Sequence, residues 1–290
     1  MFNLEYIDEY IKLALREDVG LHGDITTNSI ISENAVSHGN VIYKADGVLA
    51  GINLAARVFL NLAKMMNVEN IHIESMTPDG ALCKKGDIVA RFSGNTRLLL
   101  TGERTFLNIL QRMSGIATYA KKLTDMVKGT KARIVDTRKT TPNFRIFEKA
   151  AVVMGGAFNH RFGLYDGILI KDNHITAADG IKNAVKSARN NVHHLIKIEV
   201  EVKNLAEVRE ALEAGCDVIM LDNMNIETMS EAVKLITGRA LVEASGGISE
   251  SNLRQVAETG VDLISIGALT HQIKSQDISL KLQDAGCRHE

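Results

Sequence analysis

Basic side chains are concentrated in one segment of a chain whose formal net charge is only -1. Segment 133–174 includes these basic residues: Arg138, Lys139, Arg145, His160, Arg161 and Lys171. Arginine binds a carboxylate or phosphate through two parallel hydrogen bonds, and lysine supplies a point charge. Two nearby glycines, Gly155 and Gly156, would let the backbone approach a ligand closely. The cluster predicts a site for a small polyanion; the alternative is surface ion pairing with nearby acidic residues, namely Asp136, Glu148 and Asp166.

Carboxylates form the second group of candidates. Glu199 and Glu201 share one face of the run IEVEV, Val200 takes the other face, and Asp222 closes a later apolar run. A carboxylate inside a protein is costly to desolvate unless it has a partner. A lysine, a ribose hydroxyl or Mg²⁺ would supply one, so these residues indicate a sugar-phosphate site or an internal Lys–Glu pair.

Two glycine-containing turns follow the last two apolar runs of the chain. The first turn comprises Ser245, Gly246 and Gly247 and lies just before a predicted helix. The second turn comprises Ser265, Ile266 and Gly267. Turns after the last two strands of an α/β barrel commonly hold a phosphate through backbone N–H groups. They predict a phosphate site, and tight turns without a ligand are the alternative.

The elements that must position these residues alternate regularly after about residue 132. Helical segments separate six apolar or β-branched runs, namely ARIVDT, GILIKDN, IKIEVEV, DVIMLDN, ALVEASG and DLISIG. Strands this apolar are buried on both faces, which indicates a parallel sheet covered by helices. A closed or nearly closed α/β barrel fits better than a doubly wound sheet because no GxGxxG motif follows a first strand. The polar strand ends, including Glu243, would then converge on one site.

The first part of the chain has a different pattern. Helical spacing of apolar residues predicts a helix over about residues 4–18, and short β-like runs between 38 and 92 flank a further helix. These form a compact α+β unit. A long helix is predicted from about residue 101 to 128, with Arg104, Asn108 and Gln111 on its polar face.

Composition narrows the classes of protein. The 290 residues are 45% hydrophobic, enough for a large domain or a barrel with a smaller partner, and the near-neutral charge argues against a general nucleic-acid or membrane-surface binder. No run is long and apolar enough to span a bilayer, and the acidic N-terminal segment does not read as a signal peptide. Cys83, Cys216 and Cys287 form no CxxC pair, which favours reduced thiols in a soluble, cytoplasmic protein.

The stretch DTRKTTPNFRIFEKAAVVMGGAFNHRFGLYDGILIKDNHI closely resembles the signature of the quinolinate phosphoribosyltransferase family. The stretches TGERTFLNILQRMSGIAT, IEVEV, MLDN, EASGGI and ISIGALTHQ are similar to that family in the same order, so the resemblance covers nearly the whole chain. Asn143 and Ala157 stand where glycines are expected. Asparagine tolerates a left-handed backbone, alanine is the smallest alternative to glycine, and neither change removes a charge.

The resemblance implies a fold and an activity. The fold is α/β: an N-terminal α/β sandwich domain over residues 1–114, joined by the C-terminal tail 272–290, and an open, incomplete α/β barrel over residues 115–271. The activity is that of a phosphoribosyltransferase in pyridine nucleotide and NAD biosynthesis, which joins quinolinate to phosphoribosyl pyrophosphate and decarboxylates it. The resemblance also implies a homodimer or higher oligomer, in which Arg104 reaches into the partner's site.

The resemblance further implies a role for each candidate. The two quinolinate carboxylates and the pyrophosphate would be surrounded by Arg138, Lys139, His160, Arg161 and Lys171. Glu201 and Asp222 would hold the ribose hydroxyls and help place Mg²⁺, the expected cofactor, with no residue assigned directly as its ligand. Lys139, Lys171, Glu201 and Asp222 would be catalytic, and the two glycine-containing turns would hold phosphate.

Three alternatives to this activity remain at this point. One is a paralogue of the same fold associated with molybdenum transport, which shares much of this signature. Another is a class I aldolase that forms a Schiff base through Lys171 or Lys139, which borohydride trapping would detect. The third is a non-catalytic anion-binding or scaffold protein, which would bind ligand without releasing pyrophosphate.

Overall fold

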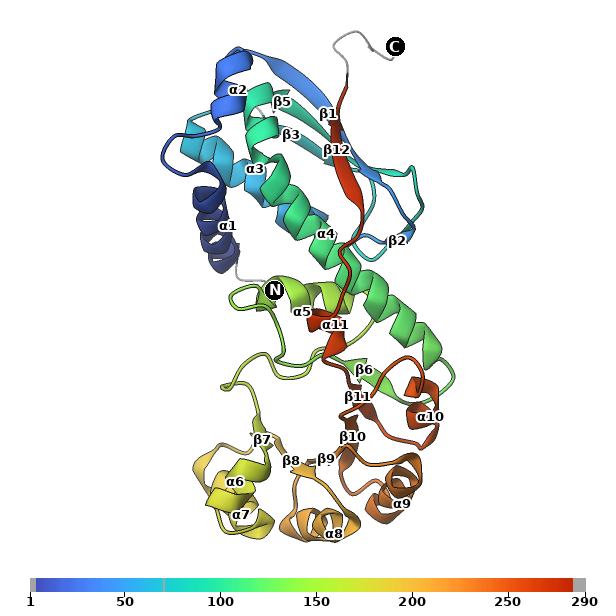
Figure 1. The fold of residues 1–290 in the computed structure, drawn as a ribbon. Helices are drawn as coiled ribbons and strands as arrows, with labels where there is room; N and C mark the ends of the chain where they lie inside the picture. The colour runs from blue at the N-terminus through green and yellow to red at the C-terminus, as the bar shows by residue number, and fades with distance from the viewer. Residues whose placement is uncertain (1–3, 70, 284–290) are drawn as a thin grey trace. The chain divides into compact units, whose positions relative to one another are not determined.

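The computed structural model describes residues 4–69 and 71–283, and the chain divides into two compact units. The first comprises residues 1–119, 140–156 and 273–290, and the second comprises residues 120–139 and 157–272. Segment 140–156, expected with the barrel, packs with the first unit. Each unit has its own sheet (Figure 1).

An antiparallel sheet with strand order β12-β1-β5-β3 organises the first unit. Its strands are β1 (Val36–Tyr43), β3 (His72–Ser75), β5 (Ile88–Asn95) and β12 (Ile278–Leu282), the last contributed by the tail. A two-stranded ladder joins β2 (Gly47–Val48) and β4 (Leu82–Cys83). The helices are α1 (Leu4–Val19), α2 (Ile25–Ile30), α3 (Ile52–Met66), α5 (Arg145–Met154) and most of α4 (Thr96–Met126).

An aromatic cluster joins the helices of the first unit to its sheet. Phe59 of α3, Phe92 of β5 and Phe106 of α4 are buried, with ring centroids 5.0 to 5.2 Å apart. Such ring pairs stabilise a core beyond the area that they bury. Helix α4 begins five residues before the predicted start because Asn95 Oδ1 accepts the N–H of Leu98 and caps the helix directly after β5.

A six-stranded parallel sheet with strand order β6-β11-β10-β9-β8-β7 organises the second unit. Its strands are β6 (Arg133–Val135), β7 (Ile168–Ile170), β8 (Ile198–Val202), β9 (Val218–Asp222), β10 (Leu241–Ser245) and β11 (Leu263–Ser265). Strands β6 and β7 are the two edges, so the predicted open α/β barrel is confirmed. All six strands lie in the six predicted apolar runs.

Helices cover the outer side of this sheet (Figure 1). They are α6 (Asp172–Ala177), α7 (Ile181–Asn191), α8 (Leu205–Ala214), α9 (Ile226–Ile236) and α10 (Leu253–Glu258), while the short helix α11 (Ala268–His271) follows β11 and is not part of this row. The side chains of Asn204 and Asn225 accept backbone N–H groups and cap α8 and α9. Within the described ranges, no helix combines the length and apolar character that crossing a bilayer requires.

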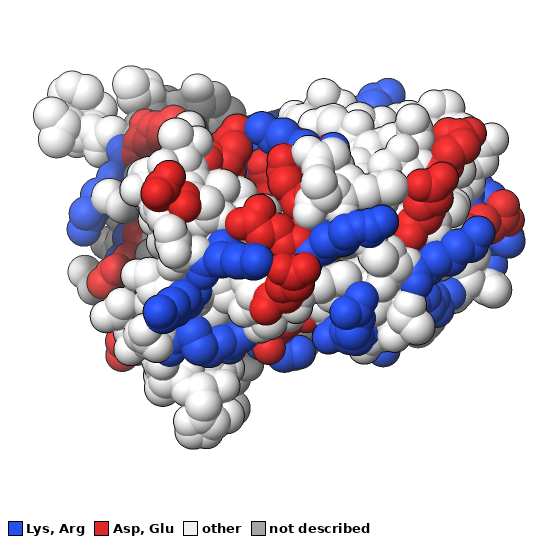
Figure 2. Space-filling model, turned by 90° about the horizontal axis from the view of Figure 1, so that it is seen from below, with Lys and Arg blue, Asp and Glu red and all other residues white. Residues whose placement is uncertain are grey.

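The surface charges match the near-neutral composition. On the face shown in Figure 2, Lys and Arg side chains are interspersed with Asp and Glu side chains. Cys83 and Cys216 are free and buried, and burial raises the pKa of both thiols, that of Cys216 to about 12. Neither is therefore a reactive nucleophile. The third cysteine, Cys287, was also predicted to be a reduced thiol, and it lies outside the described residues.

Candidate active site

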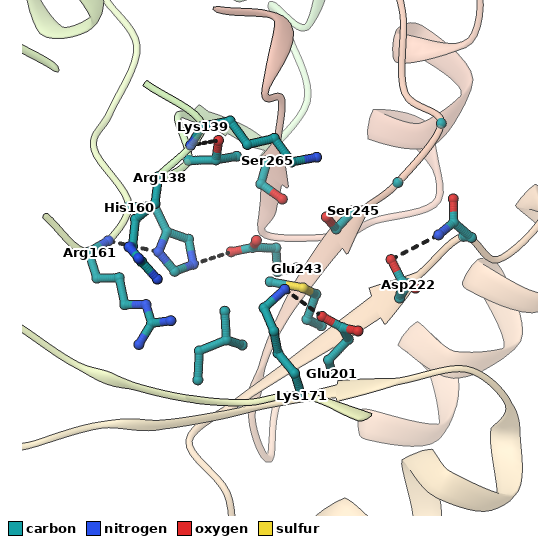
Figure 3. A pocket seen from close by; sticks show the side chains of 16 residues that line it. Arg138, Lys139, His160, Arg161, Lys171, Glu201, Asp222, Glu243, Ser245 and Ser265 are labelled. Carbon is teal, nitrogen blue, oxygen red and sulfur yellow. Dashed lines mark hydrogen bonds and ion pairs between the residues drawn. The ribbon is translucent and has the colours of Figure 1, made fainter. Parts of the chain in front are cut away.

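The polar strand ends of the second unit line one cavity of about 560 Å³ (Figure 3). Most of the predicted site residues line it, namely Arg138, Lys139, His160, Arg161, Lys171, Glu201, Asp222, Ser245, Gly246, Gly247 and Ser265. Five further residues complete the lining, namely Thr137, Leu169, Met220, Asn223 and Glu243. Basic side chains and carboxylates thus line the same cavity.

Lys171 and Glu201 connect two neighbouring strands at the mouth of this cavity. Lys171 directly follows β7, Glu201 lies on β8, and Lys171 Nζ is 3.0 Å from Glu201 Oε2. The internal Lys–Glu pair that the sequence allowed is therefore present. The Lys171 side chain is 49% exposed and that of Glu201 only 10%, so the lysine retains access to a ligand.

Two arginines lie close together on the opposite side of the cavity (Figure 3). Burial lowers the pKa of Arg161 from its ordinary value, and the positive charge of Arg138 lowers it further. One N–H of the Arg161 guanidinium donates to Gly167 O at 2.8 Å, which fixes its direction. Two like charges held together favour an anion between them.

Backbone contacts fix the position of Lys139. The buried Thr270 hydroxyl donates to Lys139 O at 2.6 Å, and Lys139 N–H donates to the Thr137 hydroxyl at 3.0 Å. The carbon chain of Lys139 also packs beside Gly267, where an added Cβ would lie 3.0 Å from Lys139 Cδ. The lysine is thus held by contacts on both sides of its Cα.

Only part of the predicted phosphate site lines the cavity. Gly246 and Gly247 have positive φ angles of 86° and 62°, and a Cβ on Gly246 would lie 2.4 Å from Asn223 Oδ1, so glycine is required there. The helix predicted directly after this turn begins only at Leu253. In the second turn, Ser265 lines the cavity, whereas the N–H of Ile266 donates to Val135 O and is not available to a phosphate.

A buried trio of ionisable groups lies at the floor of the cavity. His160 Nε2 is 3.0 Å from Glu199 Oε2 and 3.6 Å from Glu243 Oε2. Burial, and next the charge of Glu199, raises the pKa of Glu243 to about 8. Within residues 4–69 and 71–283, this is the one group of His, Cys, Asp and Glu whose potential metal-ligand atoms all lie within 4.8 Å of one another.

Other candidates lie in the first unit. Arg104 and Asn108 are exposed on α4, as expected of a polar face, whereas the Gln111 side chain donates to Ile278 O at 2.6 Å and anchors β12. Asn143 has a φ of 61°, the left-handed conformation that the expected glycine would also adopt. Ala157 is buried.

The sequence prediction missed an anchor for the turn after Lys139. Glu148, which is fully buried, pairs with Arg112 and accepts the N–H and hydroxyl of Thr141 at 3.1 and 2.8 Å. The partner of Glu148 is thus Arg112, which lies outside the basic segment 133–174 with which a surface ion pair was considered. Arg112 lies 36 residues from Glu148 in the sequence, so the only sequence signal for this contact is that the two side chains have opposite charges.

Comparison with known proteins gives a consistent result. Residues 24–114 match the N-terminal domain of quinolinate phosphoribosyl transferase, and residues 116–281 match its C-terminal domain. The chain is 43% identical to a probable carboxylating nicotinate-nucleotide pyrophosphorylase of Bacillus subtilis, over 91% of this chain and 89% of that protein. It is 42% identical to a protein of the same description from Methanocaldococcus jannaschii, over 96% and 98% of the two chains.

Solved structures agree with the sequence relatives. The nicotinate-nucleotide pyrophosphorylase of Francisella tularensis superposes with a TM-score of 0.91 at 38% identity, covering 98% of each chain. NadC from Streptococcus pyogenes superposes with a TM-score of 0.92 at 40% identity, with the same coverage. Both domains of the family are present in order, so the chain belongs to the quinolinate phosphoribosyl transferase family.

Proposed function

We propose that this enzyme transfers phosphoribosyl from phosphoribosyl pyrophosphate to quinolinate and decarboxylates the product, giving nicotinate mononucleotide, CO₂ and pyrophosphate for NAD biosynthesis. Family membership supports the reaction class. The observation that carries the proposal is one cavity whose lining includes four basic side chains and two carboxylates. These are Arg138, Lys139, Arg161 and Lys171, and Glu201 and Asp222.

The charges suggest how the two substrates divide the cavity. Arg138 and Arg161 suit the quinolinate carboxylates because each offers a planar pair of donors. Lys139 and Lys171 suit the pyrophosphate, and Glu201 and Asp222 suit the ribose hydroxyls, which donate hydrogen bonds. The Gly246–Gly247 backbone and the Ser245 and Ser265 hydroxyls line the same cavity and suit the 5′-phosphate.

Transfer follows from this arrangement. The pyridine nitrogen attacks the anomeric carbon as the bond to pyrophosphate breaks, so positive charge develops on the sugar and negative charge on the leaving group. Lysines near the leaving group stabilise its charge, and carboxylates near the ribose stabilise the cationic sugar. The C2–carboxylate bond then breaks as CO₂ departs, the adjacent positively charged ring nitrogen stabilises the electron pair left on C2, and C2 takes a proton.

Mg²⁺ fits the chemistry of the cavity. It prefers oxygen ligands and in nucleotide sites takes many of them from phosphates. Glu201 and Asp222 offer oxygens in the same cavity, but we assign them to the ribose and assign no side chain as a Mg²⁺ ligand. When bound, Mg²⁺ would neutralise charge on the departing pyrophosphate.

The proposal extends to assembly and location. We propose a homodimer in which Arg104, exposed on α4, completes the partner's site. We also propose that the enzyme is cytoplasmic, where its buried free thiols would stay reduced.

Incubation of the protein with Mg²⁺, quinolinate and phosphoribosyl pyrophosphate tests the activity. Nicotinate mononucleotide should form only when all are present. Borohydride trapping of a substrate on Lys171 or Lys139 would instead indicate an aldolase. Binding of both substrates without pyrophosphate release would contradict the proposal and indicate a non-catalytic protein.

A further inference from the structure

The trio of His160, Glu199 and Glu243 is buried and is brought together from three separate parts of the second unit. Glu243 is 1% exposed, Glu199 is 7% exposed, and the His160 side chain is 15% exposed. They come from β10, β8 and the segment after α5, so the sheet and a loop bring them together. Figure 3 shows Glu243 directed towards the His160 ring at the floor of the cavity.

Hydrogen bonds determine which nitrogen of His160 carries the proton. The backbone N–H of Arg161 donates to His160 Nδ1 at 2.7 Å, so Nδ1 is an acceptor and carries no hydrogen. The proton of the neutral ring therefore lies on Nε2, which donates to Glu199 Oε2 at 3.0 Å. A doubly protonated ring would lose the Arg161 bond, because both nitrogens would then be donors.

Glu199 and Glu243 are buried and have carboxylate oxygens within 4.8 Å of each other, so ionisation of both is strongly disfavoured. Two carboxylates close together in a buried site retain one proton between them because their charges repel. Among the described residues, Glu199 Oε1 and both oxygens of Glu243 are buried without a hydrogen-bond partner. A proton on Glu243 that is donated to the Glu199 carboxylate gives both side chains a partner. The raised pKa of Glu243 agrees with this assignment.

We propose that Glu199 and Glu243 hold one proton between them and act as positioning residues that fix His160 as its neutral Nε2–H tautomer. The inference rests on the proposed function, because that function makes the charge of His160 matter to the substrates. The sequence led us to expect a cation at His160, but in this state its side chain lines the cavity without a charge. Its Nδ1 accepts the backbone N–H of Arg161 and so orients that residue. The positive charge that meets the substrates in this cavity comes from the arginines and lysines.

Charged and polar groups of the surrounding elements complete the environment of the trio. They are Asp136 after β6, Arg138 and Arg161 in the adjoining loops, Lys171 after β7, Glu201 on β8, Asp222 on β9 and Ser265 on β11. Asp136 Oδ1 accepts the backbone N–H of His160 at 2.8 Å, so the loop is fixed independently of the ring. Substitutions of the glutamates therefore act on the ring more than on the loop.

The ¹⁵N spectrum of histidine-labelled protein tests the tautomer without depending on activity. His160 is assigned by comparison with His160→Gln. At pH 7 its Nε2 should be protonated and its Nδ1 unprotonated. An imidazolium or an Nδ1–H tautomer would overturn the proposal, whereas failure of the enzyme to use quinolinate would leave this reading unaffected.

Substitutions of Glu243 test the shared proton. Glu243→Gln keeps a neutral side chain whose amide can donate to Glu199, so kcat/KM should stay within about threefold of wild type. Glu243→Leu removes the donor and should lower kcat/KM at least about tenfold. Glu231→Gln, at an exposed position on α9, is the matched control and should behave as wild type.

If Glu243→Leu does not fold, the kinetics of Glu243→Gln and the ¹⁵N spectrum of the wild type still test the proposal. An equal loss in Glu243→Gln and Glu243→Leu would show that an ionised glutamate is required and would overturn the proposal. A metal ion retained in stoichiometric amount by the wild type and lost in Glu243→Gln would also overturn it, because a cation would then take the place of the proton.

Discussion

Lys171 Nζ and Glu201 Oε2 lie 3.0 Å apart, which joins the ends of β7 and β8 at the mouth of the cavity. The glutamate is largely buried and the lysine is half exposed, so the pair is not a surface salt bridge of the ordinary kind. Within the proposed function, substrate binding can use the exposed side of the lysine while Glu201 holds it in place.

Replacing Lys171 with Met should therefore reduce activity strongly. We expect kcat/KM to fall at least about tenfold, equivalent to about 1.4 kcal/mol, because the pyrophosphate loses a cation. The matched control is Lys182→Met, which breaks a Lys–Glu pair with Glu213 whose side chains are 60% and 64% exposed. Steady-state kinetics of both variants check this, and wild-type kinetics in Lys171→Met would remove the lysine from the site.

Nicotinate should be a much poorer substrate than quinolinate. It lacks the second carboxylate, so Arg138 and Arg161 together would bind one carboxylate fewer in the complex. Loss of a charge-assisted contact of this kind costs about 1–3 kcal/mol or more. Competition between the two acids for a limiting amount of enzyme measures the ratio directly, and equal turnover would contradict the prediction.

The ionisation of Glu243 should make stability depend on pH in a known direction. Burial raises its pKa to about 8 in the fold, from the ordinary value of 4.5 for a glutamate carboxyl. Between these values the folded state binds one more proton than the unfolded state, so this contribution to stability falls as pH rises and is constant above about 8. Glu243→Gln removes the titration.

Thermal melts of wild type, Glu243→Gln and Glu231→Gln between pH 5 and 9 measure this effect. The Tm of wild type should fall relative to that of Glu243→Gln from pH 5 to pH 8, and Glu231→Gln should follow wild type. A difference between wild type and Glu243→Gln that is independent of pH would show that Glu243 does not carry the extra proton.

Complementation between inactive chains tests the proposed shared site. Arg104→Ala and Lys139→Ala should each be nearly inactive alone because every site of each homodimer lacks one group. After random subunit exchange, half the dimers are mixed and half of their sites are intact, so activity should return to about a quarter of wild type. Demonstrated exchange without recovery would show that Arg104 does not act on the partner's site.

The strand ends of the site were predictable because the sheet determines them. Lys171, Glu201, Asp222, Ser245 and Ser265 each follow or close an apolar run, and parallel strands bring such positions to one edge. The order of the strands in the sheet then decides which of these side chains are neighbours in the cavity.

Contacts that depend on loops were not predictable in the same way. The approach of His160 to Glu243 depends on the path of segment 157–167, which pairs with β6 through Phe158 rather than through any periodic pattern. The acceptor role of His160 Nδ1 depends on one backbone N–H, that of Arg161, which no sequence pattern indicates. The start of α4 was missed because Asn95 acts both as the end of a strand and as a cap.

The most direct test of the central claim uses quinolinate labelled with ¹⁴C in its 2-carboxylate. With Mg²⁺ and phosphoribosyl pyrophosphate, the enzyme should release labelled CO₂ in equal amount to the nicotinate mononucleotide and pyrophosphate formed. Omission of phosphoribosyl pyrophosphate should abolish the release, because the electron pair left on C2 needs the positively charged ring nitrogen. A nucleotide that retains the label, or release that does not require phosphoribosyl pyrophosphate, would contradict the account.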